Sequence, residues 1–339
     1  MMAKAPDTGK IRPHLPPSGR DHVSLVLQLS VATNVVIVVT MMCVAITSRS
    51  LALVSALAEN MVDLFVQMLL WYIGVRLKKH GPKASERFPA GTARFEPVGI
   101  IAAASMMMLV AAFIIQESIT RLVNGFVKHA SEQPLQSIAA LVIVTMAIVV
   151  KLLLIVYASW VLESRSSAAV QAILTDNRND AISNAFAIAA YIAAAMKPEL
   201  WWLDAGGAIF IFLFIIGSWA KLAHEQVLKL VGICAEPEFI DQMKQVCAGH
   251  HELLQLDTIR AYHSGSKYIV EVEALVPGAM TIAEAHDIGL QLQFKFEQHE
   301  DVERAFVHLD HERRDYDEHA VSREPNAIEL YASGLEIEL

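Results

Sequence analysis

Long apolar runs separated by short polar segments occupy most of the first 230 residues. Six of these runs are of about 20 residues or more, which is enough for an α-helix to cross a bilayer. Their approximate limits are 23–47, 50–76, 96–123, 134–162, 168–196 and 202–230. The pattern predicts an all-helical membrane region with six transmembrane helices. A hydrophobic share of 54% over the whole chain agrees with a multi-pass membrane protein.

After residue 233 the pattern becomes that of a small domain with both helices and strands. Pro237 begins an amphipathic segment to about 249, and Thr281 with Glu284 has the spacing of a capping box that begins a second helix to about 299. Alternating apolar positions predict strands at about 255–263, 267–276 and 302–309. The order αββαβ predicts a ferredoxin-like α+β domain with its helices on a small sheet.

Polarity divides the chain into four expected parts. Two ends are polar and are expected to be disordered, because they lack the apolar residues needed for a core. The parts are a tail at 1–20, the six-helix domain at 21–232, the αββαβ domain at 233–311 and a charged tail at 312–339. No signal peptide is expected, since the first apolar run is already of spanning length.

Charge is distributed unevenly between the two halves. Residues 231–339 carry 22 acidic and 8 basic side chains, whereas residues 1–230 carry 14 and 19. The acidic second half argues against nucleic-acid binding. Basic residues gather between the second and third apolar runs: Arg76, Lys78, Lys79, Lys83, Arg87 and Arg94. The positive-inside rule then predicts that both termini are cytosolic.

Two pairs of carboxylates interrupt the apolar runs. Glu59 and Asp63 lie in the second run, and Asp176 and Asp180 lie in the fifth. A spacing of four residues places both members of a pair on one face of a helix. Acidic groups inside a membrane are costly and rare, so they indicate function unless they lie at helix ends or pair with a neighbour such as Arg178. Together the two pairs could offer four oxygen donors to one divalent cation.

The type of donor atom in the two acidic pairs indicates which cation they would bind. Carboxylate oxygens suit Mg²⁺, Ca²⁺ and Mn²⁺, while zinc sites normally include imidazole or thiolate. Neither acidic pair contains a histidine. This favours Mn²⁺ as the metal, and leaves Zn²⁺, Fe²⁺ or a broad specificity open.

Other polar residues in the apolar runs have two interpretations. Four amides could support the carboxylates or simply hydrogen-bond between helices. They are Asn34, Asn60, Asn177 and Asn184. Lys151, inside the fourth run, could pair with an acid or extend its side chain to the membrane interface.

Several motifs resemble those of the cation diffusion facilitator family over about residues 23–311. They are Ser50-Leu51-Ala52, Phe88-Pro89-Ala90-Gly91, Glu96-Pro97-Val98-Gly99, Asp176-Asn177-Arg178-Asn179-Asp180, Trp202-Leu203-Asp204-Ala205-Gly206-Gly207, Val276-Pro277-Gly278, Ala285-His286-Asp287 and Val302-Glu303-Arg304-Ala305-Phe306-Val307-His308-Leu309-Asp310. The chain is most similar to the metal-tolerance branch of plants and fungi that is associated with manganese. Two positions depart from the family pattern: Glu59 stands where Asp, Asn or His is usual, and Asn177 stands where the branch commonly has His.

The resemblance implies a homodimer in the lipid bilayer that exports divalent metal from the cytosol in exchange for protons. It implies no cofactor and no enzymatic activity, with the transport site between the second and fifth helices. It further implies a possible regulatory metal site at His286, His308 and Asp310, and a possible interlock of helices through Arg94, Glu96 and Asp204. A vacuolar or other internal membrane is favoured over the plasma membrane.

Two rival classes remain open from the residues alone. An intramembrane aspartyl protease also needs two membrane carboxylates, but the Gly-x-Gly-Asp loop is absent here. A membrane protein that senses metal without transporting it would carry the same carboxylates.

Overall fold

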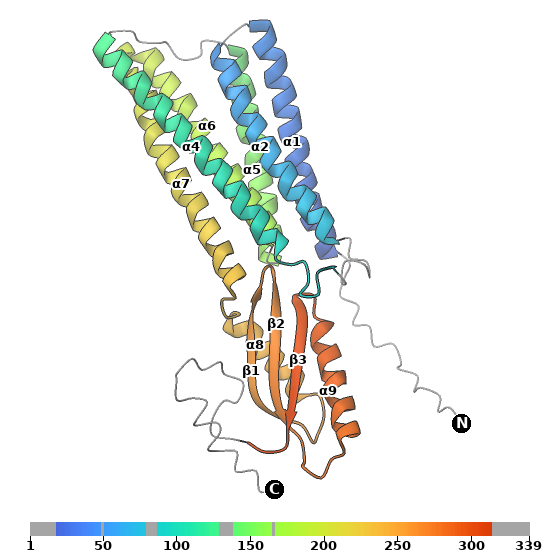
Figure 1. The fold of residues 1–339 in the computed structure, drawn as a ribbon. Helices are drawn as coiled ribbons and strands as arrows, with labels where there is room; N and C mark the ends of the chain where they lie inside the picture. Colours follow the sequence, from blue (N-terminus) through green and yellow to red (C-terminus); the bar gives the residue numbers. More distant parts are fainter. Residues whose placement is uncertain (1–17, 49–50, 79–86, 129–137, 165–166, 314–339) are drawn as a thin grey trace. The chain divides into compact units, whose positions relative to one another are not determined.

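The computed structural model describes residues 18–48, 51–78, 87–128, 138–164 and 167–313 (Figure 1). The tails expected at 1–20 and 312–339 lie almost entirely outside these residues. The chain forms two compact units. One consists mainly of the chain up to Ile233, and the other begins at Cys234.

The first unit contains long helices that follow the predicted apolar runs. They are α1 (Ser18–Ser48), α2 (Leu51–Lys78), α4 (Phe95–Lys128), α5 (Ile138–Ser164), α6 (Ala168–Met196) and α7 (Trp202–Val231). In Figure 1 these helices run side by side along the length of the unit. Helix α4 packs mainly on α7, α1 on α2 and α5 on α6.

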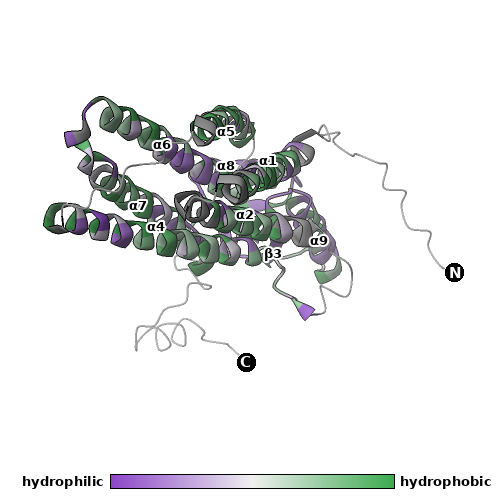
Figure 2. Ribbon diagram, turned by 90° about the horizontal axis from the view of Figure 1, so that it is seen from above, coloured by the Kyte–Doolittle hydropathy of each residue, from purple (hydrophilic) through white to green (hydrophobic). Residues whose placement is uncertain are grey.

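Four of these helices contain a stretch long and apolar enough to cross a membrane. The stretches are His22–Cys43, Phe95–Val127, Leu141–Glu163 and Trp202–Val231. The apolar stretch described in α2, Asn60–Ile73, is shorter. Helix α6 is continuous, but Asp and Asn residues break its apolar character, and Figure 2 shows a hydrophilic segment in this helix. Four candidate spans are therefore present in the described residues, and six spans remain a prediction.

Close packing in this unit depends on small residues. Ala103, Ala104 and Ala172 are fully buried in the same core as Trp219. A Cβ atom at Gly207 in α7 would lie 1.8 Å from the Phe186 ring of α6, so the glycine makes room for this ring between the two helices.

The start of α6 is held by two side chains. Ser167 caps the helix by accepting a hydrogen bond from the Val170 amide, as capping serines do. Glu96, in the first turn of α4, accepts a second one from the Ala169 amide at 3.1 Å. These contacts fix the beginning of the helix that carries Asp176 and Asp180.

The second unit has the αββαβ order expected from its sequence. Its elements are α8 (Pro237–Ala248), β1 (Gln255–Ser264), β2 (Lys267–Leu275), α9 (Ile282–Glu297) and β3 (Val302–Asp310). The sheet order is β1-β2-β3, and β2 and β3 are parallel because α9 connects them. Thr281 and Glu284 form the predicted capping box. The core includes Phe239, Leu292 and Phe296.

Candidate metal centre

Helices α2 and α6 bring three carboxylates together. Asp63 of α2 and Asp176 and Asp180 of α6 each offer an oxygen, and these oxygens lie within 4.8 Å of one another. Asp63 and Asp176 are buried, and Asp180 is partly buried. Among the residues that the structure describes, no other group of three carboxylate, imidazole or thiolate donors comes this close. The two helix faces predicted from the four-residue spacings therefore meet.

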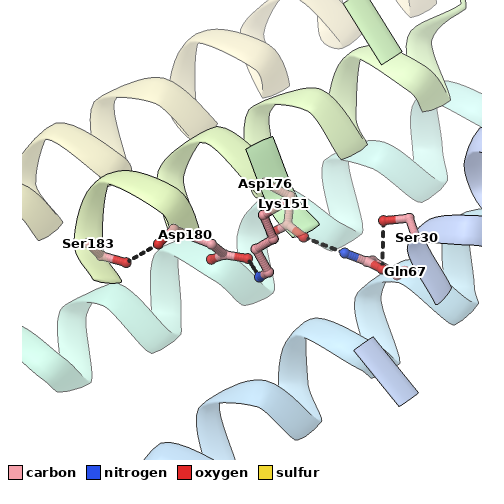
Figure 3. Close-up of polar contacts among 6 residues, drawn as sticks. All are labelled: Ser30, Gln67, Lys151, Asp176, Asp180 and Ser183. Atoms are coloured by element: carbon pink, nitrogen blue, oxygen red, sulfur yellow. Dashed lines mark hydrogen bonds and ion pairs between the residues drawn. The ribbon is translucent and has the colours of Figure 1, made fainter. Parts of the chain in front are cut away.

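Gln67 fixes one of these carboxylates. It lies one turn after Asp63 on α2 and is fully buried. Its Nε2 donates to Asp176 Oδ2 at 2.8 Å, and its Oε1 accepts from the Ser30 hydroxyl of α1 at 3.0 Å (Figure 3). This chain of hydrogen bonds across three helices orients the Asp176 carboxylate, as the outer contacts of metal ligands commonly do.

The second oxygen of Asp176 has a different environment. Within the described part of the chain, Asp176 Oδ1 is buried and has no hydrogen-bond donor. A buried carboxylate oxygen without a donor is unfavourable unless water or a cation satisfies it. The arrangement therefore leaves this oxygen available to a metal ion.

Lys151 of α5 forms an ion pair with Asp180 (Figure 3). The lysine side chain is 2% exposed, so it points into the helical unit rather than to the membrane interface. Ser183 donates to the backbone carbonyl of Asp180 at 3.1 Å. Of the two interpretations that the sequence left open for Lys151, the structure shows the acidic partner.

Three buried amides lie on α1 and α6, the helices of Ser30 and of Asp176 and Asp180. Asn34 follows Ser30 by one turn on α1, and Asn177 and Asn179 adjoin Asp176 and Asp180 on α6. All three are buried, and among the described contacts the Asn34 amide nitrogen and both polar atoms of Asn177 and Asn179 have no hydrogen-bond partner. The amide oxygens need a donor, water or a cation, whereas the amide nitrogens need water or another hydrogen-bond acceptor. Asn60 and Asn184 are only partly buried.

Glu59 remains a prediction. Its backbone lies in α2, one turn before Asp63, but its side chain lies outside the described residues. The fourth donor expected from the sequence is therefore not placed.

Sequence reasoning missed Gln67, Ser30 and Asn179. A signal for Gln67 was present, because a residue four positions after Asp63 lies on the same helix face. The amide was overlooked because an uncharged polar residue in an apolar run usually serves helix packing.

The other predicted site residues lie apart from this centre. Arg94 is exposed, Glu96 contacts the start of α6, and Asp204 is partly buried in the first turn of α7. None of these observations tests the interlock across a dimer.

The proposed regulatory residues are not assembled in one chain. His286 of α9 and His308 of β3 are exposed, and Asp310 of β3 is partly buried with its Oδ1 3.1 Å from His311 Nδ1. In the described part of the chain they do not form a group of three donors. A regulatory metal here stays a prediction.

Buried oxygen donors and a buried ammonium inside a unit of long apolar helices are typical of membrane proteins that handle cations. Comparison with known proteins agrees. Residues 27–231 match the family model described as the cation efflux transmembrane domain, and residues 235–312 match that of the cation efflux protein cytoplasmic domain. The chain therefore belongs to the cation efflux family, also called the cation diffusion facilitators.

Curated relatives include plant metal tolerance proteins. Metal tolerance protein 5 of Oryza sativa subsp. japonica is 33% identical, over 89% of this chain and 70% of the relative. Metal tolerance protein 11 of Arabidopsis thaliana is 33% identical over 88% and 74%, and metal tolerance protein 10 of the same plant is 35% identical over 87% and 67%. The resemblance to the metal-tolerance branch is confirmed.

Family membership decides between the classes left open by the residues. The chain is an integral membrane transporter of divalent metal cations and not an enzyme, which removes the aspartyl protease. Its second unit is a cytoplasmic domain of the dimerisation type.

Gln67→Leu is expected to weaken metal binding by about 10- to 100-fold, the usual effect of removing a group that orients a metal ligand. Leucine keeps the volume but leaves Asp176 without its donor. Isothermal titration of purified protein with Mn²⁺ measures the change. Gln293→Leu, on α9 of the second unit, is the control and should leave the Kd unaltered. A wild-type Kd for Gln67→Leu would show that this amide does not prepare the centre.

Proposed function

We propose that this chain exports Mn²⁺ from the cytosol in exchange for protons, with Asp63, Asp176 and Asp180 as ligands. The observation that supports the proposal is the group of three carboxylates from α2 and α6, with oxygens within 4.8 Å of one another. Two helices that each supply ligands can open and close the centre toward either side of the membrane when they move relative to one another.

The donor set favours manganese. Every titratable donor in the group is a carboxylate, and the buried side chains of Asn177 and Asn179, next to Asp176 and Asp180 in the sequence, offer amide oxygens. Hard oxygen ligands suit Mn²⁺, whereas a zinc site would be expected to include imidazole or thiolate. Zn²⁺, Fe²⁺ or several divalent metals are the second candidates, since Mn²⁺ stands lowest in the general order of affinity of divalent metals.

Proton exchange follows from the same carboxylates. A carboxylate must be deprotonated to bind a metal, so protons and metal compete for the same oxygens. Protons arriving from an acidic compartment would release the metal there. This argument fits a vacuolar or other internal membrane better than the plasma membrane.

We further propose that the chain has six transmembrane spans with both termini in the cytosol and forms a homodimer. We also propose that Glu59 is a fourth metal donor. The basic loop after the second apolar run supports the orientation. The side chains of that loop from Arg76 to Lys83 lie outside the described residues.

The test is metal flux into proteoliposomes. Mn²⁺, Zn²⁺, Fe²⁺ and Co²⁺ are supplied one at a time, with a metal-sensitive dye and a pH-sensitive dye inside. Mn²⁺ uptake with matching proton release, faster than for the other metals, is expected. Mn²⁺ flux without proton release would overturn the exchange, and faster Zn²⁺ flux would overturn the choice of metal.

A further inference from the structure

Lys151 has an unusual position for a lysine. It lies at the midpoint of α5, and Ala147 and Leu154, about one turn away on either side, are both buried. Its own side chain is 2% exposed. A lysine near the middle of a membrane helix is unfavourable unless it is paired, and its long stem would otherwise let the ammonium reach the interface. The ion pair with Asp180 therefore holds the ammonium inside the unit.

The partner of Lys151 is one of the three clustered carboxylates. Asp63, Asp176 and Asp180 hold their oxygens within 4.8 Å of one another, so their negative charges repel when all three are ionised. Gln67 offers Asp176 a neutral donor, whereas Lys151 offers Asp180 a full positive charge. The ammonium thus compensates part of the charge that a metal ion would otherwise compensate.

We propose that Lys151 is the counter-ion of the metal-free centre, and that an incoming divalent cation displaces its ammonium from Asp180. The inference rests on the proposed function of this centre. Two cations on one carboxylate repel strongly where the surroundings are apolar. The lysine stem has four flexible carbons, so the ammonium can leave Asp180 without movement of α5.

Displacement has a consequence for affinity. While Lys151 occupies Asp180, the centre is not ready to bind, so the apparent Kd equals the intrinsic Kd divided by the fraction of molecules in which the ammonium has left Asp180. When the metal leaves, the returning ammonium stabilises the vacated carboxylate. Lys151 would therefore weaken binding and assist release, which a transporter needs and a storage site does not.

The simpler alternative is a static ion pair that only joins α5 to α6. Breaking a static pair by removing one partner destabilises a protein. Any tighter metal binding after loss of a static pair would come only from lost repulsion through space, and would not depend on Asp180. The two interpretations therefore predict different changes in the Kd.

The experiment compares Mn²⁺ binding to purified full-length variants by isothermal titration. Lys151→Met is expected to lower the Kd roughly tenfold or more, because binding no longer breaks an ion pair. In an Asp180→Asn background, where the pair is already lost, the same substitution should change the Kd by less than about twofold. Lys221→Met, at an exposed position of α7, is the matched control and should not alter the Kd.

Three results would contradict the displacement of Lys151 by the metal. An unchanged or higher Kd in Lys151→Met overturns the inference and supports the static pair. Equal tightening with and without Asp180 also overturns it, since the lysine would then act by repulsion through space. If the wild-type protein binds no Mn²⁺, both the proposed metal and this inference are overturned. If the wild-type protein binds Mn²⁺ and the variants do not behave as expected, only the role of Lys151 is overturned.

A second variant covers the case in which Lys151→Met does not fold. Lys151→Arg keeps the charge, and its planar fork pairs more firmly with a carboxylate. Displacement then becomes harder, so the Kd for Mn²⁺ should rise severalfold. A wild-type Kd in the arginine variant would also overturn the inference.

Discussion

Replacing Asp63 with Ala is expected to abolish metal transport while the protein still folds. The substitution removes the donor that α2 contributes to the described group of three carboxylates. Alanine is the best helix former, and removing a charge from a membrane interior does not by itself destabilise the helix. We expect the rate of Mn²⁺ uptake into proteoliposomes to fall by at least about 100-fold, because metal ligands matter more than the groups that orient them.

A matched control distinguishes loss of the centre from loss of an acidic residue. Glu117 of α4 is exposed and pairs with Arg121 at 3.0 Å. Exposed ion pairs contribute only about 0–1 kcal/mol, so Glu117→Ala should transport nearly as well as the wild-type protein. Wild-type transport by Asp63→Ala, with Glu117→Ala also normal, would show that the three carboxylates are not the transport site.

Replacing Asp176 with His is expected to shift the preference of the transporter from Mn²⁺ toward Zn²⁺. Asp176 is 1% exposed and lies within the group, so its replacement changes the donor set directly. Imidazole is a good zinc ligand and a poorer partner for manganese. We expect the ratio of Zn²⁺ to Mn²⁺ flux to rise by roughly tenfold or more, because nitrogen donors favour zinc.

The flux ratio is measured with both metals in the same proteoliposome preparation, so that differences in protein content cancel. Glu117→His introduces an imidazole into the same helical unit away from the centre, and should leave the ratio unaltered. An unaltered ratio in Asp176→His as well would mean that the metal is not selected by the type of donor on α6.

Local features of this chain were determined by its sequence. The run predicted at 168–196 is the observed helix Ala168–Met196, and the capping box predicted at Thr281 and Glu284 is present. Helical periodicity and capping depend on residues within a turn or two of one another, so they can be read from adjacent positions. The same reasoning placed Asp176 and Asp180 on one face of their helix.

The residues offered two carboxylate pairs and the resemblance implied that they share one site, but the contact between the pairs is seen only in the tertiary structure. Nothing in the spacing of Asp63 indicates which helix its face will meet, and packing alone brings that face to Asp176. Gln67 orients the Asp176 carboxylate only because its amide hydrogen-bonds to both α1 and α6. The sequence left Lys151 two destinations, the interface or an acid. The long side chain can reach either, and the packing of α5 on α6 determines which one is within reach.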